Sequence, residues 1–199
     1  MKTLLRKLLL SIMSTWVWRY VLTWWIPAIR FGGKPLNEEV IAEIQSVIQV
    51  GDCILMKDPY KLSNILIGGQ WSHAAICTQY ITLLGPIISE MGHAGYQELR
   101  LQKALSNSKH VAILRPKGRT VDYALEMAAD ARWLGLACQG YDFSFSHGES
   151  SLYCSELVAL ADRLGLYKAD PSDLAGLGHE YISPDGLYKA KGAVIVYEV

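Results

Sequence analysis

Hydrophobic positions recur at helical spacing in three stretches of the chain, residues 38–49, 120–135 and 151–165. The first has Asn37 as a candidate N-cap and acidic residues in its first turn. Its apolar positions are Val40, Ile41, Ile44, Val47 and Ile48. In the second stretch Val121, Leu125, Ala128 and Ala129 share one side, and Gly135 is the expected stop. Gly165 is the expected stop of the third helix.

Short apolar runs between turn residues predict five β-strands in one small sheet. They cover residues 53–57, 73–79, 86–91, 111–116 and 193–199. Because strands and helices are segregated along the chain instead of alternating regularly, we expect an α+β fold with a small, mostly antiparallel sheet. No internal repeat is visible, and the length suits one globular domain, residues 34–199, with an appendage, residues 1–33.

The appendage is apolar and rich in aromatic residues, among them Trp16, Trp18, Tyr20, Trp24 and Trp25. As a helix it would place its polar residues, including Lys7 and Arg19, on one narrow stripe, with Leu, Met, Val and Trp on the other side. Such a pattern favours a helix in a membrane interface, and we expect a membrane-associated protein. A bilayer span and packing against the protein's own domain or a partner subunit are the alternatives. Arg19 interrupts the apolar run, so a cleaved signal peptide is not expected.

The charge balance excludes one class of function. Lys plus Arg and Asp plus Glu both number 19, so no overall electric field attracts nucleic acid, and we expect no nucleic-acid partner. The four cysteines form no CxxC pair, and a chain of this size needs no disulfide scaffold. No cofactor is predicted, and the pattern does not define an oligomeric state.

Cys154 lies near the start of the third predicted helix. If Ser150 or Ser151 caps that helix, the cysteine occupies its first turn, where free N–H groups and the helix dipole favour a thiolate. An inert, buried cysteine is the alternative interpretation, because free cysteines are often core residues. A nucleophile also needs a base, and the base needs an orienting group.

His73 is the candidate base, since it opens a predicted strand whose backbone would hold the imidazole firmly. The other histidines are weaker candidates for the base. His93 and His147 lie in turns expected to be exposed, His110 precedes a predicted strand, and His179 lies in a stretch expected at the surface. Glu90 ends the apolar run at 86–90, where a carboxylate is out of place without a partner. It could fix the imidazole tautomer as the third member of a triad.

Six motifs occur in the order found in permuted NlpC-like papain-fold proteins. They are GDCILM at 51–56, WSHAAI at 71–76, ISE at 88–90, YDFSF at 141–145, YCSELV at 153–158 and SPDGL at 183–187. The chain resembles the YiiX type of that group over roughly residues 37–199. In this group a circular permutation places the histidine strand before the cysteine helix, and this sequence has that order.

The resemblance implies a permuted papain-like fold and a Cys-His-Glu triad of Cys154, His73 and Glu90, with Tyr141 as a pocket wall or oxyanion donor. Asp52 and Glu156 match structural positions. Gly186 departs from the expected SPDDL motif, and Cys53 replaces a usual aliphatic residue.

We therefore expect a cysteine hydrolase or acyltransferase that cleaves an amide or ester of a lipid-linked or cell-wall peptide through an acyl-enzyme. A membrane-attached module that binds lipid or peptide without turnover is the alternative function. Metal binding has one hint, the three-residue spacing of Glu90 and His93, and no metal is expected. The uncleaved N-terminus favours the cytoplasmic side of the membrane and the resemblance favours the envelope side, so both stay open.

Overall fold

The computed structural model describes residues 36–57, 69–142, 145, 150–169, 171–173 and 180–199. The expected appendage 1–33, His147 and His179 lie outside these residues. Within the described residues, no helix has both the length and the apolar character needed to cross a membrane.

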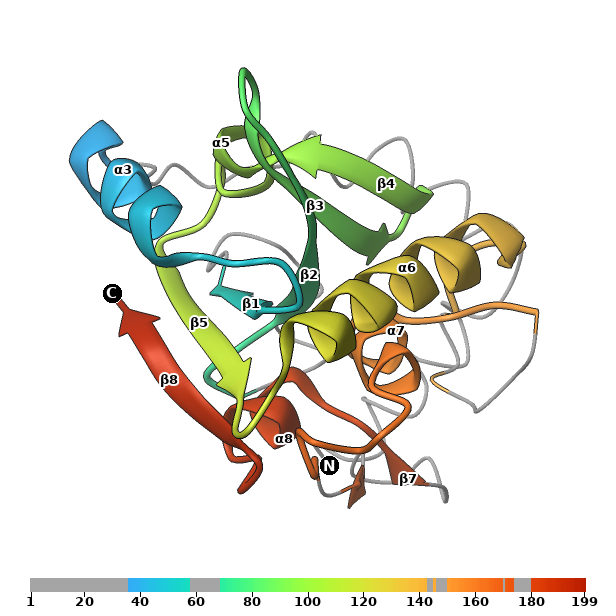
Figure 1. Cartoon of the computed structure of the whole chain (residues 1–199). Helices are drawn as coiled ribbons and strands as arrows, with labels where there is room; N and C mark the ends of the chain where they lie inside the picture. The colour runs from blue at the N-terminus through green and yellow to red at the C-terminus, as the bar shows by residue number, and fades with distance from the viewer. Residues whose placement is uncertain (1–35, 58–68, 143–144, 146–149, 170, 174–179) are drawn as a thin grey trace, which may run out of the picture.

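A six-stranded antiparallel sheet in the order β4-β3-β2-β1-β5-β8 forms the centre of the fold (Figure 1). Its strands are β1 (Cys53–Lys57), β2 (His73–Ile81), β3 (Gly85–Gly92), β4 (Gly95–Arg100), β5 (His110–Pro116) and β8 (Ala193–Glu198). The helices are α3 (Glu38–Val47), α5 (Leu101–Ala104), α6 (Val121–Ala137), α7 (Cys154–Ala161) and α8 (Pro184–Tyr188). Two short strands, β6 (Ser172–Asp173) and β7 (Glu180–Tyr181), pair separately.

Helices cover both faces of the sheet. Alternate residues of β1 point to opposite faces: Leu55 packs toward α6, α7 and α8, and Ile54 packs toward α3 and α5. The first face holds Met127 of α6 and Val158 of α7 in its core, and the second holds Ile44 of α3. The inner strands β1, β2, β3 and β5 are therefore largely buried on both faces, which explains why they appear in the sequence as continuous apolar runs.

All five predicted strands are present, together with β4, which the sequence analysis missed. Its sequence GYQELR has few apolar residues because β4 is an edge strand of the sheet, in which no residue is fully buried. His93 lies in the exposed turn between β3 and β4, as expected.

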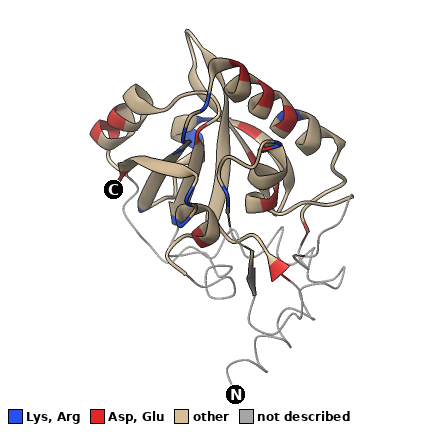
Figure 2. Cartoon of the chain, turned by 60° about the horizontal axis from the view of Figure 1, so that its bottom comes forward, with Lys and Arg blue, Asp and Glu red and all other residues tan. Residues whose placement is uncertain are grey.

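Helix α6 differs from its prediction at two points. Gly135 does not stop the helix, which continues to Ala137; a Cβ atom at Gly135 would lie 2.1 Å from Cδ2 of Tyr96, so only glycine lets the ring pack there. The side with Val121 and Leu125 faces outward, and the buried side begins with Tyr123 and Ala124. Acidic residues run beside this outward apolar side (Figure 2).

Helix α7 is shorter than predicted, and neither Ser150 nor Ser151 caps it. Its N-cap is Tyr153, and the helix ends at Asp162 instead of continuing to Gly165. The Asp162 carboxylate accepts hydrogen bonds from the backbone N–H groups of Leu166 and Tyr167 and from the hydroxyl of Tyr123. Asp162 thus ends the helix by bonding to the chain that follows it.

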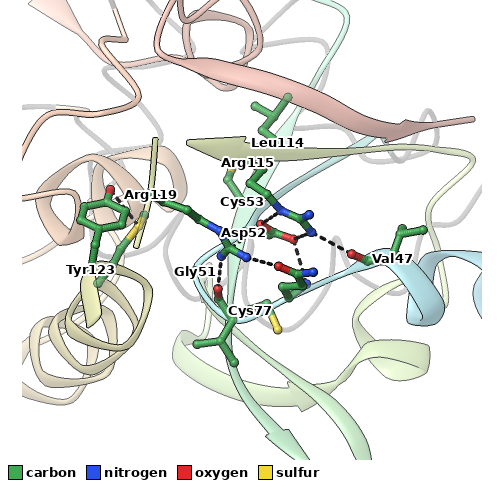
Figure 3. A network of polar contacts seen from close by, with 12 residues as sticks. Val47, Gly51, Asp52, Cys53, Cys77, Leu114, Arg115, Arg119 and Tyr123 are labelled. Atoms are coloured by element: carbon green, nitrogen blue, oxygen red, sulfur yellow. Dashed lines mark hydrogen bonds and ion pairs between the residues drawn. The ribbon is translucent and has the colours of Figure 1, made fainter. Parts of the chain in front are cut away.

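A buried carboxylate fixes the turn that enters β1. Asp52 is fully buried and accepts hydrogen bonds from Arg115 at 2.9 and 2.7 Å and from the N–H of Gln49 at 2.8 Å (Figure 3). Arg119 lies 3.5 Å from the same carboxylate and donates to the carbonyl of Val50. Asp52 therefore joins the end of α3, the start of β1 and β5 in one polar cluster, which agrees with its expected structural role.

Replacing Asp52 by alanine should lower the free energy of unfolding by about 3 kcal/mol, because Arg115 and Arg119 would lose their shared anion while partly buried. Chemical denaturation measures this change. The control is Glu126→Ala on exposed α6, which should change stability by less than about 0.5 kcal/mol. Equal stability of the two variants would contradict the structural role of Asp52.

Candidate active site

His73 and Glu90 meet at the point where β2 and β3 separate. The pairing of these strands extends from Ile81 only as far as Ile76 and Ser89, and beyond it the two side chains face each other. Nε2 of His73 lies 3.0 Å from Oε2 of Glu90, and both side chains are mostly buried. Because Nε2 faces the carboxylate, Nδ1 is the ring nitrogen left for a third group.

Cys154 supplies that third group. It is the first residue of α7, a helix that packs against both β2 and β3, and it is buried. Its sulfur hydrogen-bonds the His73 side chain and accepts from the backbone N–H groups of Ala74 and Ser155. The edge of β2 that β3 leaves unpaired therefore helps to hold the sulfur. The structure brings together the three residues that the sequence predicted, Cys154, His73 and Glu90.

The charges of these groups depend on one another. Burial by itself would raise the pKa of Cys154, but the His73 imidazolium and the hydrogen bonds to sulfur outweigh burial and lower it. Burial would lower the pKa of His73, but the Glu90 carboxylate and the Cys154 sulfur outweigh burial and raise it to about 9. At neutral pH these shifts favour a thiolate beside an imidazolium.

Tyr141 is the fourth predicted residue at this place. A parallel β-bridge to Leu152 holds it beside the chain that enters α7, and its hydroxyl hydrogen-bonds the sulfur of Cys154. Burial and the neighbouring sulfur raise the pKa of Tyr141 well above its usual range, so the hydroxyl stays protonated and remains a donor. Its ring packs edge-on against Phe145.

The residues on both sides of Cys154 are bonded to Ile182. The Tyr153 hydroxyl accepts a hydrogen bond from the Ile182 N–H at 3.0 Å, and the Ser155 hydroxyl donates to the Ile182 carbonyl at 2.7 Å. Glu156 accepts from the N–H of Tyr153 at 3.4 Å, which caps the first turn of α7. The start of the helix is therefore fixed by side chains on either side of the sulfur.

Asp185, three residues after Ile182, fixes the turn that precedes His73. Its carboxylate accepts from the N–H groups of Gln70 at 3.1 Å and Trp71 at 2.8 Å, in the turn that leads into His73. Gly69 lies so close that a Cβ atom there would meet this carboxylate at 2.2 Å. The segment 182–185 thus connects the helix of Cys154 with the strand of His73.

The sequence analysis missed these positioning contacts. The motif at 183–187 contributed to the family resemblance, but its hydrogen bonds could not be predicted from it. Bonds between residues more than 100 positions apart, such as that from Trp71 to Asp185, leave no pattern in the local sequence. The spacing of Glu90 and His93 leads to no metal site in the described part of the chain, where no group of three or more His, Cys, Asp or Glu side chains could hold an ion. His110 is exposed at the start of β5, away from the triad's strands.

A cysteine at the start of a helix, paired with a histidine from a strand that comes earlier in the chain, defines the permuted class of papain-like folds. The chain belongs to one family of this class, the permuted papain-like amidase enzymes of the YaeF/YiiX, C92 family, whose model matches residues 47–169. The match covers more than half of the chain and includes Cys154, His73 and Glu90.

A solved structure agrees on the fold. The crystal structure of the metalloprotein YiiX from Escherichia coli O157:H7 is similar with a TM-score of 0.63 and 19% sequence identity, over 76% of this chain and 97% of that chain. At this identity the similarity shows the shared fold. A comparison with curated proteins gave no match.

Removing the imidazole should raise the pKa of Cys154, because burial would remain while its main stabilising charge is lost. His73→Ala should therefore react more slowly with iodoacetamide near pH 7, by about tenfold for each unit that the pKa rises. The measurement is the pH dependence of alkylation at Cys154, followed by mass spectrometry. Cys138→Ser is the control and should keep the wild-type profile. An unchanged profile in His73→Ala would contradict the ion pair.

Asp185→Ala should displace His73 from the sulfur, because the turn at 70–71 loses both of its side-chain acceptors. We expect kcat/KM to fall about tenfold and the alkylation profile of Cys154 to move toward higher pH. Asp185→Asn keeps one acceptor oxygen and should give an intermediate shift. A loss of stability with no shift of the alkylation profile would show that Asp185 only supports the fold.

Proposed function

We propose that this protein is a cysteine amidase-type hydrolase in which Cys154 is the nucleophile, His73 the acid and base, and Glu90 the group that orients His73. The observation that carries the proposal is the contact of one imidazole with both a carboxylate and a thiol, with pKa shifts that favour the ion pair. A reactive thiolate needs this combination, whereas an inert core cysteine does not.

In the proposed reaction the Cys154 thiolate attacks the carbonyl carbon of an amide or ester, and a carbon–sulfur bond forms while the carbonyl oxygen becomes negative. The N–H of Cys154, at the first position of α7, and the hydroxyl of Tyr141 are the donors available to that oxygen. Tyr141 bonds the sulfur in the resting state. The sulfur loses its negative charge as the carbon–sulfur bond forms, so the hydroxyl is then free to turn to the oxyanion of the tetrahedral intermediate.

His73 then passes its proton to the departing amine or alcohol as the tetrahedral intermediate collapses to an acyl-enzyme. The neutral imidazole next takes a proton from water, whose oxygen attacks the thioester carbon and releases the acid and the thiolate. An acceptor alcohol or amine in place of water would make the same cycle an acyl transfer. Glu90 holds the Nε2 side of the ring throughout the cycle.

We further propose that the substrate is a lipid-linked or cell-wall peptide and that residues 1–33 keep the enzyme at a membrane surface. The sequence of that segment supports this location, because it combines many aromatic side chains with flanking cations. A substrate that carries a lipid would then be concentrated in the same surface.

The test compares the wild type with Cys154→Ser on extracts of lipids and cell-wall peptides, with products identified by mass spectrometry. We expect products with a newly freed carboxylate from the wild type, an acyl adduct on Cys154 in rapidly quenched samples, and neither from Cys154→Ser. The control variant Cys138→Ser changes a cysteine that is not part of the proposed triad, and it should behave as the wild type does. Saturable binding without turnover, unaffected by His73→Ala, would show a binding module instead.

A further inference from the structure

The β2–β3 hairpin ends in an apolar tip that projects from the protein. The turn at 82–84 joins the two strands, and Leu83 is 94% exposed, with Tyr80, Ile81 and Leu84 also exposed beside it. In Figure 1 this hairpin extends beyond α5 and the body of the sheet. An exposed group of large apolar side chains at the end of a projecting hairpin is unusual on a protein surface that meets only water.

The outer part of the hairpin, residues 74–89, carries no charge. From residue 74 to residue 89 the sequence contains no Asp, Glu, Lys or Arg, and the first acidic residue of the hairpin is Glu90, near the far end of β3 from the turn. Exposed strands and turns usually carry charges that keep them in water and prevent aggregation. An uncharged tip can enter an apolar environment without leaving a charged group desolvated.

Cations lie beside the tip. Arg100 lines the same surface cleft as residues 82–86, and Lys103 follows on α5; both side chains are exposed. Neither forms an ion pair with another residue in the described part of the chain. An apolar tip with free cations at its base matches the acyl chains and anionic headgroups of a bilayer.

The described chain begins with a helix that lies against the hairpin. Residue 36 begins the described chain directly before α3, which contacts α5, and Gln45 of α3 lies against Gly85, next to the turn at 82–84. Residues 1–35 contain no Asp or Glu. Their cations are Lys2, Arg6, Lys7, Arg19, Arg30 and Lys34. The apolar, cationic segment is therefore joined through the chain to α3, a helix that contacts α5 and lies against the hairpin.

We propose that the tip of the β2–β3 hairpin inserts Leu83 and Leu84 into the interface of an anionic bilayer, with Arg100 and Lys103 at the headgroups. This second membrane contact would act together with residues 1–33 and would fix the orientation of the enzyme on the surface. The inference extends the membrane location proposed above and does not depend on the catalytic mechanism.

The outward side of α6 is the competing surface, since it exposes Leu125, Trp133 and Leu136. Asp122 and Glu126, also exposed, lie next to Leu125, and Asp130 lies one turn before Trp133 on the same helix. An anionic bilayer would repel these carboxylates, so the charges favour the hairpin over α6 as the membrane contact. Leu136, which is 71% exposed, supplies a matched control for Leu83.

The test places an environment-sensitive fluorophore at either position in the full chain. Leu83→Cys and Leu136→Cys, each in a Cys138→Ser/Cys154→Ser background, are labelled with NBD and mixed with phosphatidylcholine vesicles that contain about one quarter phosphatidylglycerol. We expect NBD at position 83 to brighten and shift to the blue, and NBD at position 136 to stay unchanged. Vesicle binding with no change at position 83, or with the larger change at position 136, would overturn the proposal.

A second measurement uses unlabelled protein and sedimentation with the same vesicles. Leu83→Asp should weaken binding about tenfold or more, because a charge replaces a large apolar side chain in the interface, whereas Leu136→Asp should bind as the wild type does. Equal binding of these two variants would overturn the insertion of the hairpin. If the wild type fails to sediment, the membrane location itself is wrong, while turnover by Cys154 would remain an independent question.

Discussion

The contact of His73 with two acidic groups is the interaction on which this account depends. The ring lies 3.0 Å from the Glu90 carboxylate and also hydrogen-bonds the Cys154 sulfur, in a place that excludes most solvent. Burial alone would lower the pKa of His73 and raise that of Cys154. The Glu90 carboxylate and the Cys154 sulfur instead raise the pKa of His73 to about 9, and His73 in turn lowers the pKa of Cys154.

The site forms where the pairing between β2 and β3 ends. Where β3 stops pairing with β2, the N–H of Ala74 is left for the Cys154 sulfur, and α7 begins there. The segment from Ile182 to Asp185 then bonds both to the start of α7 and to the turn before His73. A segment near the end of the chain thus holds together a strand and a helix that are about eighty residues apart in sequence.

The sequence was sufficient where local patterns determine the structure. The apolar runs located five of the six strands in the sheet, and Asn37 caps α3 as expected, because both features depend on neighbouring residues. The position of Cys154 in the first turn of α7 was also predicted, although Tyr153 and not a serine is the N-cap. The grouping of Cys154 with His73 and Glu90 rested on resemblance, since no periodicity connects residues so far apart.

The missed features all depend on tertiary contacts. Strand β4 has too few apolar residues to be recognised alone, and it exists because it pairs with β3. Gly135 looked like a helix stop, but it is a packing position for the ring of Tyr96. Asp185 forms its bonds with residues that lie more than 100 positions earlier.

The protonation of His73 tests the central claim most directly. Imidazole NMR resonances, assigned with His73→Gln, would follow all five histidines of the chain as the pH rises. The account predicts that His73 stays protonated until about pH 9 and that Cys154→Ser lowers its pKa. A His73 that titrates near the ordinary value of about 6.5, unchanged by Cys154→Ser, would contradict it.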